Sequence, residues 1–203
     1  MKKKIIINIG RQFGSGGLAV AKALSAKLGI PVYDREIIAK AADDSGFSTE
    51  LFAEKDEKRS FFSLSSFFSS NFGSADQNYM SNEALFNLQC EAIKNIAEQG
   101  SAIIVGRCSN YVLRNFEGTL NVFLTSPDEI RAQRVSERAG ISVEKATSLI
   151  KSNDKTREEY YNYFTFGNWG VASTYDLCLD SSILGIEGTA DFIISFARKA
   201  GLL

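Results

Sequence analysis

The chain has 203 residues, which is enough for one globular domain that buries about 70% of its unfolded surface. Its 23 Lys and Arg residues nearly balance its 24 Asp and Glu residues, so no net field favours binding to nucleic acid or to an anionic membrane. Any anion-binding site must therefore depend on a local arrangement of residues and not on the net charge of the chain. Histidine is absent, which excludes Ser-His-Asp triads and histidine-ligated zinc sites.

The first predicted unit is a strand followed by a helix. Residues 5–9 are apolar except for Asn8, as expected for a strand that is buried on both faces of a parallel sheet. The next segment repeats apolar residues at helical spacing, at Leu18, Ala21, Leu24 and Leu28. Gly29 and Pro31 are expected to end this helix.

Four further strands are predicted, and each is followed by a helix-like segment. They cover residues 30–33, 101–106, 119–125 and 175–181. Helical patterning follows the first of these at residues 35–46, and a long helix is expected to begin at Ser81. The alternation predicts a doubly wound α/β sheet of five strands, whose ligands bind beyond the carboxyl ends of the strands.

The helix after residues 119–125 has a clear start signal. Ser126 is the expected N-cap, Glu129 three residues later completes a capping box, and Pro127 suits the first helical position. Asp128 and Glu129 would also face the positive end of the helix dipole.

Residues 47–80 interrupt the alternation of strands and helices with a segment rich in serine and phenylalanine, most of all at 60–73. One interpretation is a surface excursion whose phenylalanines pack on the body of the protein or on a second subunit. The other is a mobile lobe that covers a substrate. Both interpretations remain open from the sequence.

A glycine-rich turn, residues 14–17, lies between the first strand and its helix, and we call it the glycine loop. Such a turn exposes backbone N–H groups beside the positive end of a helix, which makes an anion site. The pattern G-x-x-x-x-G-K-[ST] is nevertheless not met. Arg11 occupies the place of the first glycine, Gly17 that of the lysine, and Leu18 that of the hydroxyl residue. A phosphate loop and a structural turn are both compatible with this stretch.

Arginines and lysines occur on three other predicted elements. Arg107 follows the strand at 101–106, where it could bind a phosphate with two hydrogen bonds or form a surface ion pair. Two successive helices contain cations at Arg131, Arg134, Arg138, Lys151, Lys155 and Arg157. These cations form either solvated helix faces or a cationic lid over a phosphate substrate.

An aromatic run follows these cations, at Tyr160, Tyr161, Tyr163, Phe164, Phe166 and Trp169. Its rings could stack on a base, but we expect them to pack the end of the helix against the body.

Cys90, Cys108 and Cys178 form no C-x-x-C pair, so we expect three reduced thiols. No apolar stretch reaches the roughly 20 residues that span a bilayer, and we expect a cytoplasmic protein.

Five segments spread over nearly the whole chain form a specific set of motifs. They are GRQFGSGGLAVAKALSAKLGIPVYDREII, IIVGRCSNYVL, VFLTSPDEIRAQRV, ATSLIKSNDKTREEYYNYFTFGNWG and YDLCLDSSILGIEGTADFI. In this order they resemble the cytidylate kinase-like family of P-loop proteins. The resemblance implies one kinase-like domain over residues 1–203, with a three-layer P-loop NTPase fold around a five-stranded parallel sheet. It also implies a small inserted substrate lobe at 34–80 and a helical lid region at 131–170.

The resemblance also implies a reaction. Bacterial cytidylate kinases, which are more distant relatives, transfer the terminal phosphoryl group of ATP to CMP or dCMP with Mg²⁺. The expected partners are therefore small-molecule nucleotides, with no DNA, RNA or membrane partner, and self-association stays an open alternative. A purely structural, oligomerising protein without nucleotide affinity is a further hypothesis, based on the phenylalanine-rich segment.

Roles for individual residues follow from the same likeness. The family's donor phosphate loop matches Gly14, Ser15, Gly16 and Gly17. Asp34 and Arg35 match the start of the nucleotide-monophosphate lobe, and Arg107 matches the arginine of an Asp-Gly-Arg motif that binds the acceptor phosphate. Cations that would neutralise transferring phosphates are Arg131, Arg134 and Arg157, the last within an Asp-x-x-Arg pattern that begins at Asp154.

The chain also departs from the kinase pattern at positions that matter chemically. Gly17 replaces the loop lysine, Leu18 and Ala19 provide no hydroxyl for magnesium, and Val105 replaces the Asp of Asp-Gly-Arg. Arg11 is our candidate for the missing cation, ahead of Lys22. The metal ligands stay unassigned, and a nucleotide-binding or regulatory module with weakened catalysis is the alternative function.

Overall fold

The computed structural model describes residues 4–34 and 79–203, and for residues 79–82 it describes the backbone alone. The predicted helix at 35–46, Arg35, the serine- and phenylalanine-rich segment and nearly all of the predicted lobe at 34–80 lie outside the described residues. The predicted lobe therefore stays a prediction.

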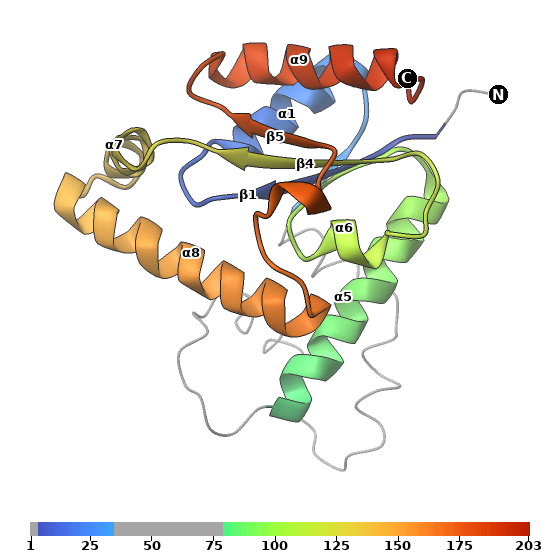
Figure 1. Cartoon of the computed structure of the whole chain (residues 1–203), viewed down its shortest axis with the longest axis horizontal. Helices are drawn as coiled ribbons and strands as arrows, with labels where there is room; N and C mark the ends of the chain where they lie inside the picture. The colour runs from blue at the N-terminus through green and yellow to red at the C-terminus, as the bar shows by residue number, and fades with distance from the viewer. Residues whose placement is uncertain (1–3, 35–78) are drawn as a thin grey trace.

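A parallel sheet forms the centre of the described structure (Figure 1). Its strands are β1 (Ile6–Arg11), β2 (Val32–Tyr33), β3 (Ala102–Val105), β4 (Thr119–Thr125) and β5 (Leu177–Asp180). Their spatial order is β2-β3-β1-β4-β5, and each neighbouring pair is parallel. This confirms the predicted five-stranded parallel sheet, although β2, β3 and β5 are shorter than expected.

Helices cover both faces of the sheet, which gives three layers (Figure 1). The helices α1 (Gly17–Leu28) and α9 (Gly185–Lys199) lie on one side, and α5 (Tyr79–Gln99), α6 (Ser109–Val112) and α8 (Val143–Thr165) lie on the other. α7 (Asp128–Ala139) follows β4 at the end of the sheet, and a short 3₁₀ turn, η1 (Ala172–Thr174), precedes β5.

The alternation of side chains along β1 divides the core between the two faces. Ile7 and Ile9 are fully buried with residues of α1 and α9, whereas Ile6 packs with residues of α5 on the opposite face. Asn8 interrupts the apolar run, and its side-chain amide donates a 2.9 Å hydrogen bond to Oδ1 of Asn121, its register partner on β4. The amide N–H group of this polar residue is thus paired in the central strand, whereas its Oδ1 is buried without a hydrogen-bond partner among the described residues.

The expected start of α7 is wrong by one residue. The structure has Pro127 as the N-cap, because the Pro127 carbonyl accepts the first helical hydrogen bond, from Arg131 N at 3.0 Å. Ser126 stays with the end of the strand, where its backbone N–H donates to Oε1 of Gln12 at 3.4 Å. Its buried hydroxyl caps no helix and finds no partner among the described residues.

The aromatic run packs against the body, as expected. Tyr161 is buried with Phe86 of α5, and the rings of Phe164 and Phe86 stack with centroids 4.2 Å apart. Phe166, at the end of α8, is the exception because 93% of it is exposed.

The three cysteines are free thiols. Within residues 4–34 and 79–203, no helix has both the length and the apolar character needed to cross a bilayer.

Candidate active site

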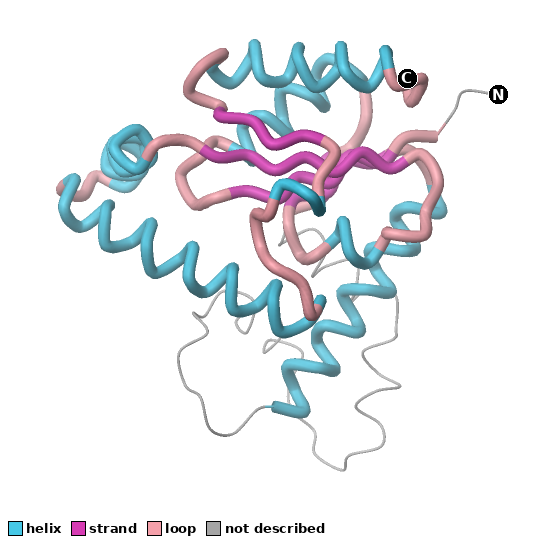
Figure 2. The backbone as a smooth tube through the Cα atoms, viewed as in Figure 1, coloured by secondary structure: helices cyan, strands magenta, loops and turns pink. Residues whose placement is uncertain are grey.

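The glycine loop forms a tight turn at the edge of the sheet where the loops after β1, β4 and β5 emerge (Figure 2). Gly14 and Gly16 have φ angles of 82° and 83°, which strain any residue with a side chain. A Cβ atom on Gly16 would lie 2.6 Å from Cδ1 of Ile186, and one on Gly14 would lie 2.9 Å from the carbonyl oxygen of Arg131. Both the backbone conformation and the close packing therefore require glycine.

The other contacts of the loop leave the start of α1 open to a ligand. Ser15 is fully buried, and its hydroxyl donates to the Gln12 carbonyl at 2.9 Å. Gly16 is the N-cap of α1, and no side chain in the described part of the chain caps that helix. The N–H groups of its first turn are therefore available to an anion, as they are at helix N-termini that bind phosphate.

The side chain of Arg11 lies across the place where the loop lysine would stand. A Cβ atom on Gly17 would come within 2.8 Å of Cγ and 2.9 Å of Cβ of Arg11. A Cβ atom on Gly106 would overlap Nη1 of the same arginine. The guanidinium thus lies between the start of α1 and the end of β3, the two elements that bear the predicted donor and acceptor groups.

Arg131 is an anchor between the two helices that follow β4. Its side chain is only 4% exposed, and it forms ion pairs with Asp128 on its own helix and with Asp154 on α8. Nη1 also donates to the Phe13 carbonyl at 3.0 Å. Of the two expected alternatives for these cations, the solvated face is therefore wrong for Arg131, because the pairing with carboxylates permits its burial.

Arg134 lies directly beside the glycine loop. Nη1 of Arg134 donates to Oγ of Ser181 at 3.1 Å, and that hydroxyl donates to the Ser15 carbonyl. A Cβ atom on Gly16 would lie 3.6 Å from Nη1 of Arg134. This guanidinium is thus next to the N-terminus of α1, where the predicted anion site lies.

Arg157 extends from α8 to β1. Its Nη1 donates to the Arg11 carbonyl at 3.0 Å, and its guanidinium lies 5.2 Å from the centre of the Phe13 ring. Burial lowers the pKa of Arg157 to about 10, an effect that Asp154 opposes and that nearby arginines reinforce. The guanidinium is still protonated at neutral pH, and it faces several like charges.

Arg107 follows β3 in an unusual backbone conformation. Gly106, Arg107 and Cys108 have φ angles of 78°, 59° and 56°, so two consecutive residues with side chains occupy the left-handed region. Such strain persists only where the surrounding structure enforces it. The guanidinium of Arg107 lies over the ring of Tyr160, 5.7 Å from its centroid, on the side of the sheet that α5 and α8 cover.

Asp34 follows β2 directly, at the same edge of the sheet as Arg107, and is partly buried. It is the acidic residue of the predicted acceptor site, and it lies within the described residues. Its partner in that prediction, Arg35, lies outside the described residues.

A magnesium ion held by protein side chains does not fit the described part of the site. Leu18 and Ala19 occupy the positions where the family resemblance places a magnesium-binding hydroxyl, and neither side chain has an oxygen atom. Within the described ranges, no group of three or more His, Cys, Asp or Glu residues could hold a metal ion. We therefore derive no catalytic step through a protein-bound metal.

Sequence reasoning missed three residues of this site, namely Gln12, Phe13 and Ser181. Ser181 follows β5 at the edge where ligands bind, so its position was a usable signal. Oε1 of Gln12 accepts hydrogen bonds from the Thr125 hydroxyl and the Ser126 N–H, which joins the turn after β1 to the end of β4. These contacts are far apart in sequence, and no local pattern indicates them.

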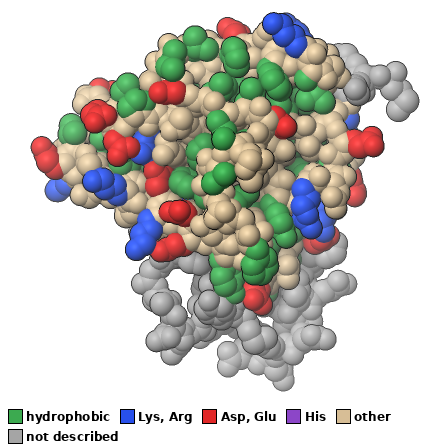
Figure 3. All heavy atoms as spheres, in the orientation of Figure 1, with side chains coloured by type: hydrophobic (Ala, Val, Ile, Leu, Met, Phe, Trp, Pro, Cys, Tyr) green, Lys and Arg blue, Asp and Glu red, His purple; other side chains and the backbone are tan. Residues whose placement is uncertain are grey.

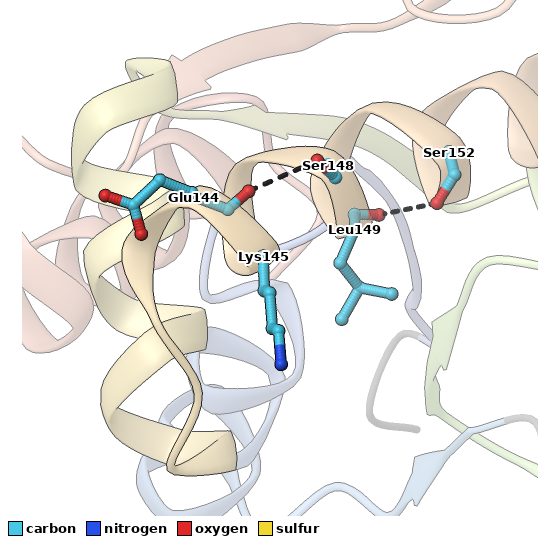
Figure 4. A pocket seen from close by; sticks show the side chains of 5 residues that line it. All are labelled: Glu144, Lys145, Ser148, Leu149 and Ser152. Carbon is cyan, nitrogen blue, oxygen red and sulfur yellow. Dashed lines mark hydrogen bonds between the residues drawn. The ribbon is translucent and has the colours of Figure 1, made fainter.

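A shallow depression of about 490 Å³ lies on the outer side of α8 (Figure 4). It is lined by Glu144, Lys145, Ser148, Leu149 and Ser152, all of one helix. The two serine hydroxyls donate to carbonyls of their own helix, at 3.2 Å and 3.1 Å. Among the described residues, no polar groups from separate elements converge there, so we do not include the depression in the candidate site.

The visible surface over α7 and α8 has positive and negative side chains interspersed (Figure 3). This matches the near balance of charges in the sequence.

The strand order, the glycine loop after β1 and the helices on both faces define the α/β fold of P-loop kinases. A shikimate kinase from Bacteroides thetaiotaomicron shares this fold, with a TM-score of 0.55 and 14% identity, over 98% of this chain and 99% of that one. A protein of Eubacterium ventriosum, described only as uncharacterized, has a TM-score of 0.72 and 27% identity, over 96% of this chain and 99% of that one.

The sequence identifies the family within this class. The model of the cytidylate kinase-like family matches residues 6–183. The cytidylate kinase of Methanopyrus kandleri is 29% identical over 187 residues, which are 88% of this chain and 85% of that protein. The chain belongs to the cytidylate kinase-like family, and the resemblance expected from its motifs is confirmed.

Proposed function

We propose that this protein transfers the terminal phosphoryl group of ATP to a nucleoside monophosphate, with CMP or dCMP as the favoured acceptor. Membership of the cytidylate kinase-like family supports phosphotransfer, and relatives named cytidylate kinase support the acceptor. The single observation on which the proposal rests is the position of Arg11. Its side chain packs on Gly17, where the loop lysine is missing, and its guanidinium lies against Gly106 at the acceptor side.

In this proposal the backbone of the glycine loop binds the donor phosphates through N–H groups at the start of α1. Arg11 neutralises the charge that develops between donor and acceptor, in place of the lysine. Phosphoryl transfer depends mainly on positioning and on charge neutralisation, so a relocated cation can serve if it reaches the same phosphates. The donor is ATP with Mg²⁺, since phosphoryl transfer from ATP commonly uses a divalent ion.

The remaining cations have separate roles in the proposal. Arg134 and Arg157 neutralise the donor phosphates from α7 and α8, and Arg131 holds these two helices in register through its carboxylate partners. Arg107 binds the acceptor phosphate at the end of β3, with Arg35 as its predicted partner. Asp34 orients the acceptor from the end of β2.

The experiment is ATP-dependent phosphorylation of CMP, dCMP, UMP and AMP by the wild type, Arg11→Ala and Arg107→Ala. We expect Arg11→Ala to lower kcat by about 10²–10³-fold, because it removes a charge that acts in the transition state. Arg107→Ala should raise the KM for the acceptor. Lys22→Ala removes an exposed positive charge from α1 and should change neither constant. If Arg11→Ala retains the wild-type kcat, Arg11 is not the bridging cation.

The second candidate function is a nucleotide-binding or regulatory module that does not transfer phosphate. The identities of Gly17, Leu18 and Val105 favour it, because each removes a group that the related kinases use. Wild-type protein that binds ATP but phosphorylates no acceptor would support this function and overturn the proposed transfer. Stabilisation by ATP in a thermal-shift titration would also exclude a purely structural protein.

A further inference from the structure

Phe13 precedes the glycine loop and joins it to both of the helices α7 and α8. Its backbone N–H donates to Oδ1 of Asp154 at 2.6 Å, and its carbonyl accepts from Arg131 at 3.0 Å. Its ring packs against the small core between the two helices, which contains Val135 and Ile150. Phe13 is therefore fixed through its backbone and its ring at the same time.

Two guanidinium groups lie near the same ring. Arg157 of α8 is 5.2 Å from the ring centroid, and Arg138 of α7 is 5.5 Å from it. An aromatic face attracts a cation at such distances, and the attraction is stronger where the groups are desolvated. The ring thus attracts these two guanidinium groups without the burial of a further charged side chain.

The arginines need such an attraction because they repel one another. Burial and the charges of Arg107, Arg131 and Arg138 all act to lower the pKa of Arg157, and Asp154 is the carboxylate that opposes them. Asp154 is already paired with Arg131 and with the Phe13 N–H. Besides the hydrogen bond to the Arg11 carbonyl, the Phe13 ring is thus a further attractive contact that opposes this repulsion at Arg157.

We infer that Phe13 is a positioning residue, whose ring holds Arg157 against the Arg11 carbonyl beside the glycine loop before the nucleotide binds. The inference rests on the proposed donor role of this loop. The cation of α8 is then already in place in the free protein, so ATP does not have to order it. The face of the ring is what matters, and apolar volume alone does not replace it.

The test compares Phe13→Leu with Phe13→Tyr. Leucine keeps an apolar side chain in the small core but has no aromatic face, whereas tyrosine keeps the face. Phe192→Leu, on the partly exposed side of α9, is the matched control for the same chemical change elsewhere. The measurements are the dissociation constant for ATP without acceptor, kcat and KM for ATP, and the urea midpoint of unfolding.

We expect Phe13→Leu to weaken ATP binding by roughly 3- to 30-fold, the range that corresponds to one or two cation–π contacts. Phe13→Tyr should recover the affinity, and Phe192→Leu should not change it. In an Arg157→Ala background, Phe13→Leu should have almost no further effect on ATP affinity. Equal ATP affinity in Phe13→Leu and Phe13→Tyr, or losses that follow the urea midpoints alone, would overturn the inference.

The binding measurement separates this inference from the proposed function. If the wild type binds ATP and transfers nothing, the proposed function fails, and the comparison of leucine with tyrosine still decides the role of Phe13. If the wild type transfers phosphate and the two variants bind ATP equally well, the positioning role alone fails. A wild type with no affinity for ATP would overturn both.

Discussion

Gly17 is the residue at which this loop differs most from a lysine-containing phosphate loop, and its space is taken by Arg11. A Cβ atom at position 17 would press on Cβ and Cγ of Arg11, the part of that side chain that cannot move without displacing its guanidinium. We predict that Gly17→Ala lowers kcat by at least about 10-fold in the wild type and has little effect in an Arg11→Ala background. A double-mutant cycle on kcat measures this coupling.

Controls for this cycle are available in the same chain. Gly100→Ala introduces a methyl group where, apart from its chain neighbours, no described residue has an atom within 4 Å, so it should leave kcat unchanged. The double variant Arg11→Ala, Gly17→Lys returns a lysine to the loop, and position 17 has a φ angle that any residue can adopt. It should recover part of the activity that Arg11→Ala loses. Additive effects of Gly17→Ala and Arg11→Ala would show that the two residues do not act together.

Features that depend on neighbouring residues in the sequence were easier to predict than contacts between residues that only the fold brings together. The positions of the glycine loop, Arg107 and Asp34 after their strands followed from the alternation of strands and helices, because the carboxyl ends of parallel strands share one edge. The burial of Arg131 did not follow, because its partner Asp154 is 23 residues away on another helix. The capping box at Ser126 failed because contacts with Gln12 keep that residue with the strand.

At the scale of elements, α7 and α8 form a hairpin that is held to the turn after β1 chiefly through Asp154. This carboxylate, which is only 15% exposed, accepts from the Phe13 N–H and pairs with the buried guanidinium of Arg131. The pattern of residues 131–170 predicted a cationic segment here, but not its attachment to the loop. The attachment supports the view that the two helices and the loop act as one unit.

We predict that Asp154→Asn destabilises the protein by about 3 kcal/mol, since it leaves a buried arginine with one of its two carboxylates. Glu159→Gln is the control on the same helix, because Glu159 pairs with Lys155 at 3.8 Å on the exposed surface. That change should cost less than about 0.5 kcal/mol. Urea denaturation of both variants measures the difference, and equal midpoints would mean that the buried ion pair does not hold the hairpin.

At the scale of the whole molecule, the packing of helices on the sheet determines how the free energy of unfolding depends on pH in the alkaline range. The packing around α5 and α6 buries the thiol of Cys108 and partly buries that of Cys90. Burial raises the pKa of Cys90 to about 11 and that of Cys108 to about 12, from an ordinary value of 9.0. Cys178 is exposed on the edge strand β5 and is the natural comparison.

These pKa shifts determine whether the free energy of unfolding rises or falls with pH, and over which pH range. Between pH 9 and the folded-state pKa, the unfolded chain has lost protons that the folded chain keeps, so the free energy of unfolding falls as pH rises, by up to about 1.4 kcal/mol per pH unit for each buried thiol. Below pH 10 Arg157 is protonated in both states and adds little. We predict a loss of about 1 kcal/mol for the buried Cys108 and a smaller loss for the partly exposed Cys90 between pH 8 and pH 10. Urea unfolding at these two pH values measures it, and a Cys90→Ala, Cys108→Ala variant should lose much of the dependence while Cys178→Ala keeps it. If the double variant retains the full slope, the alkaline loss of stability arises from other groups and these thiols are not protected by the core.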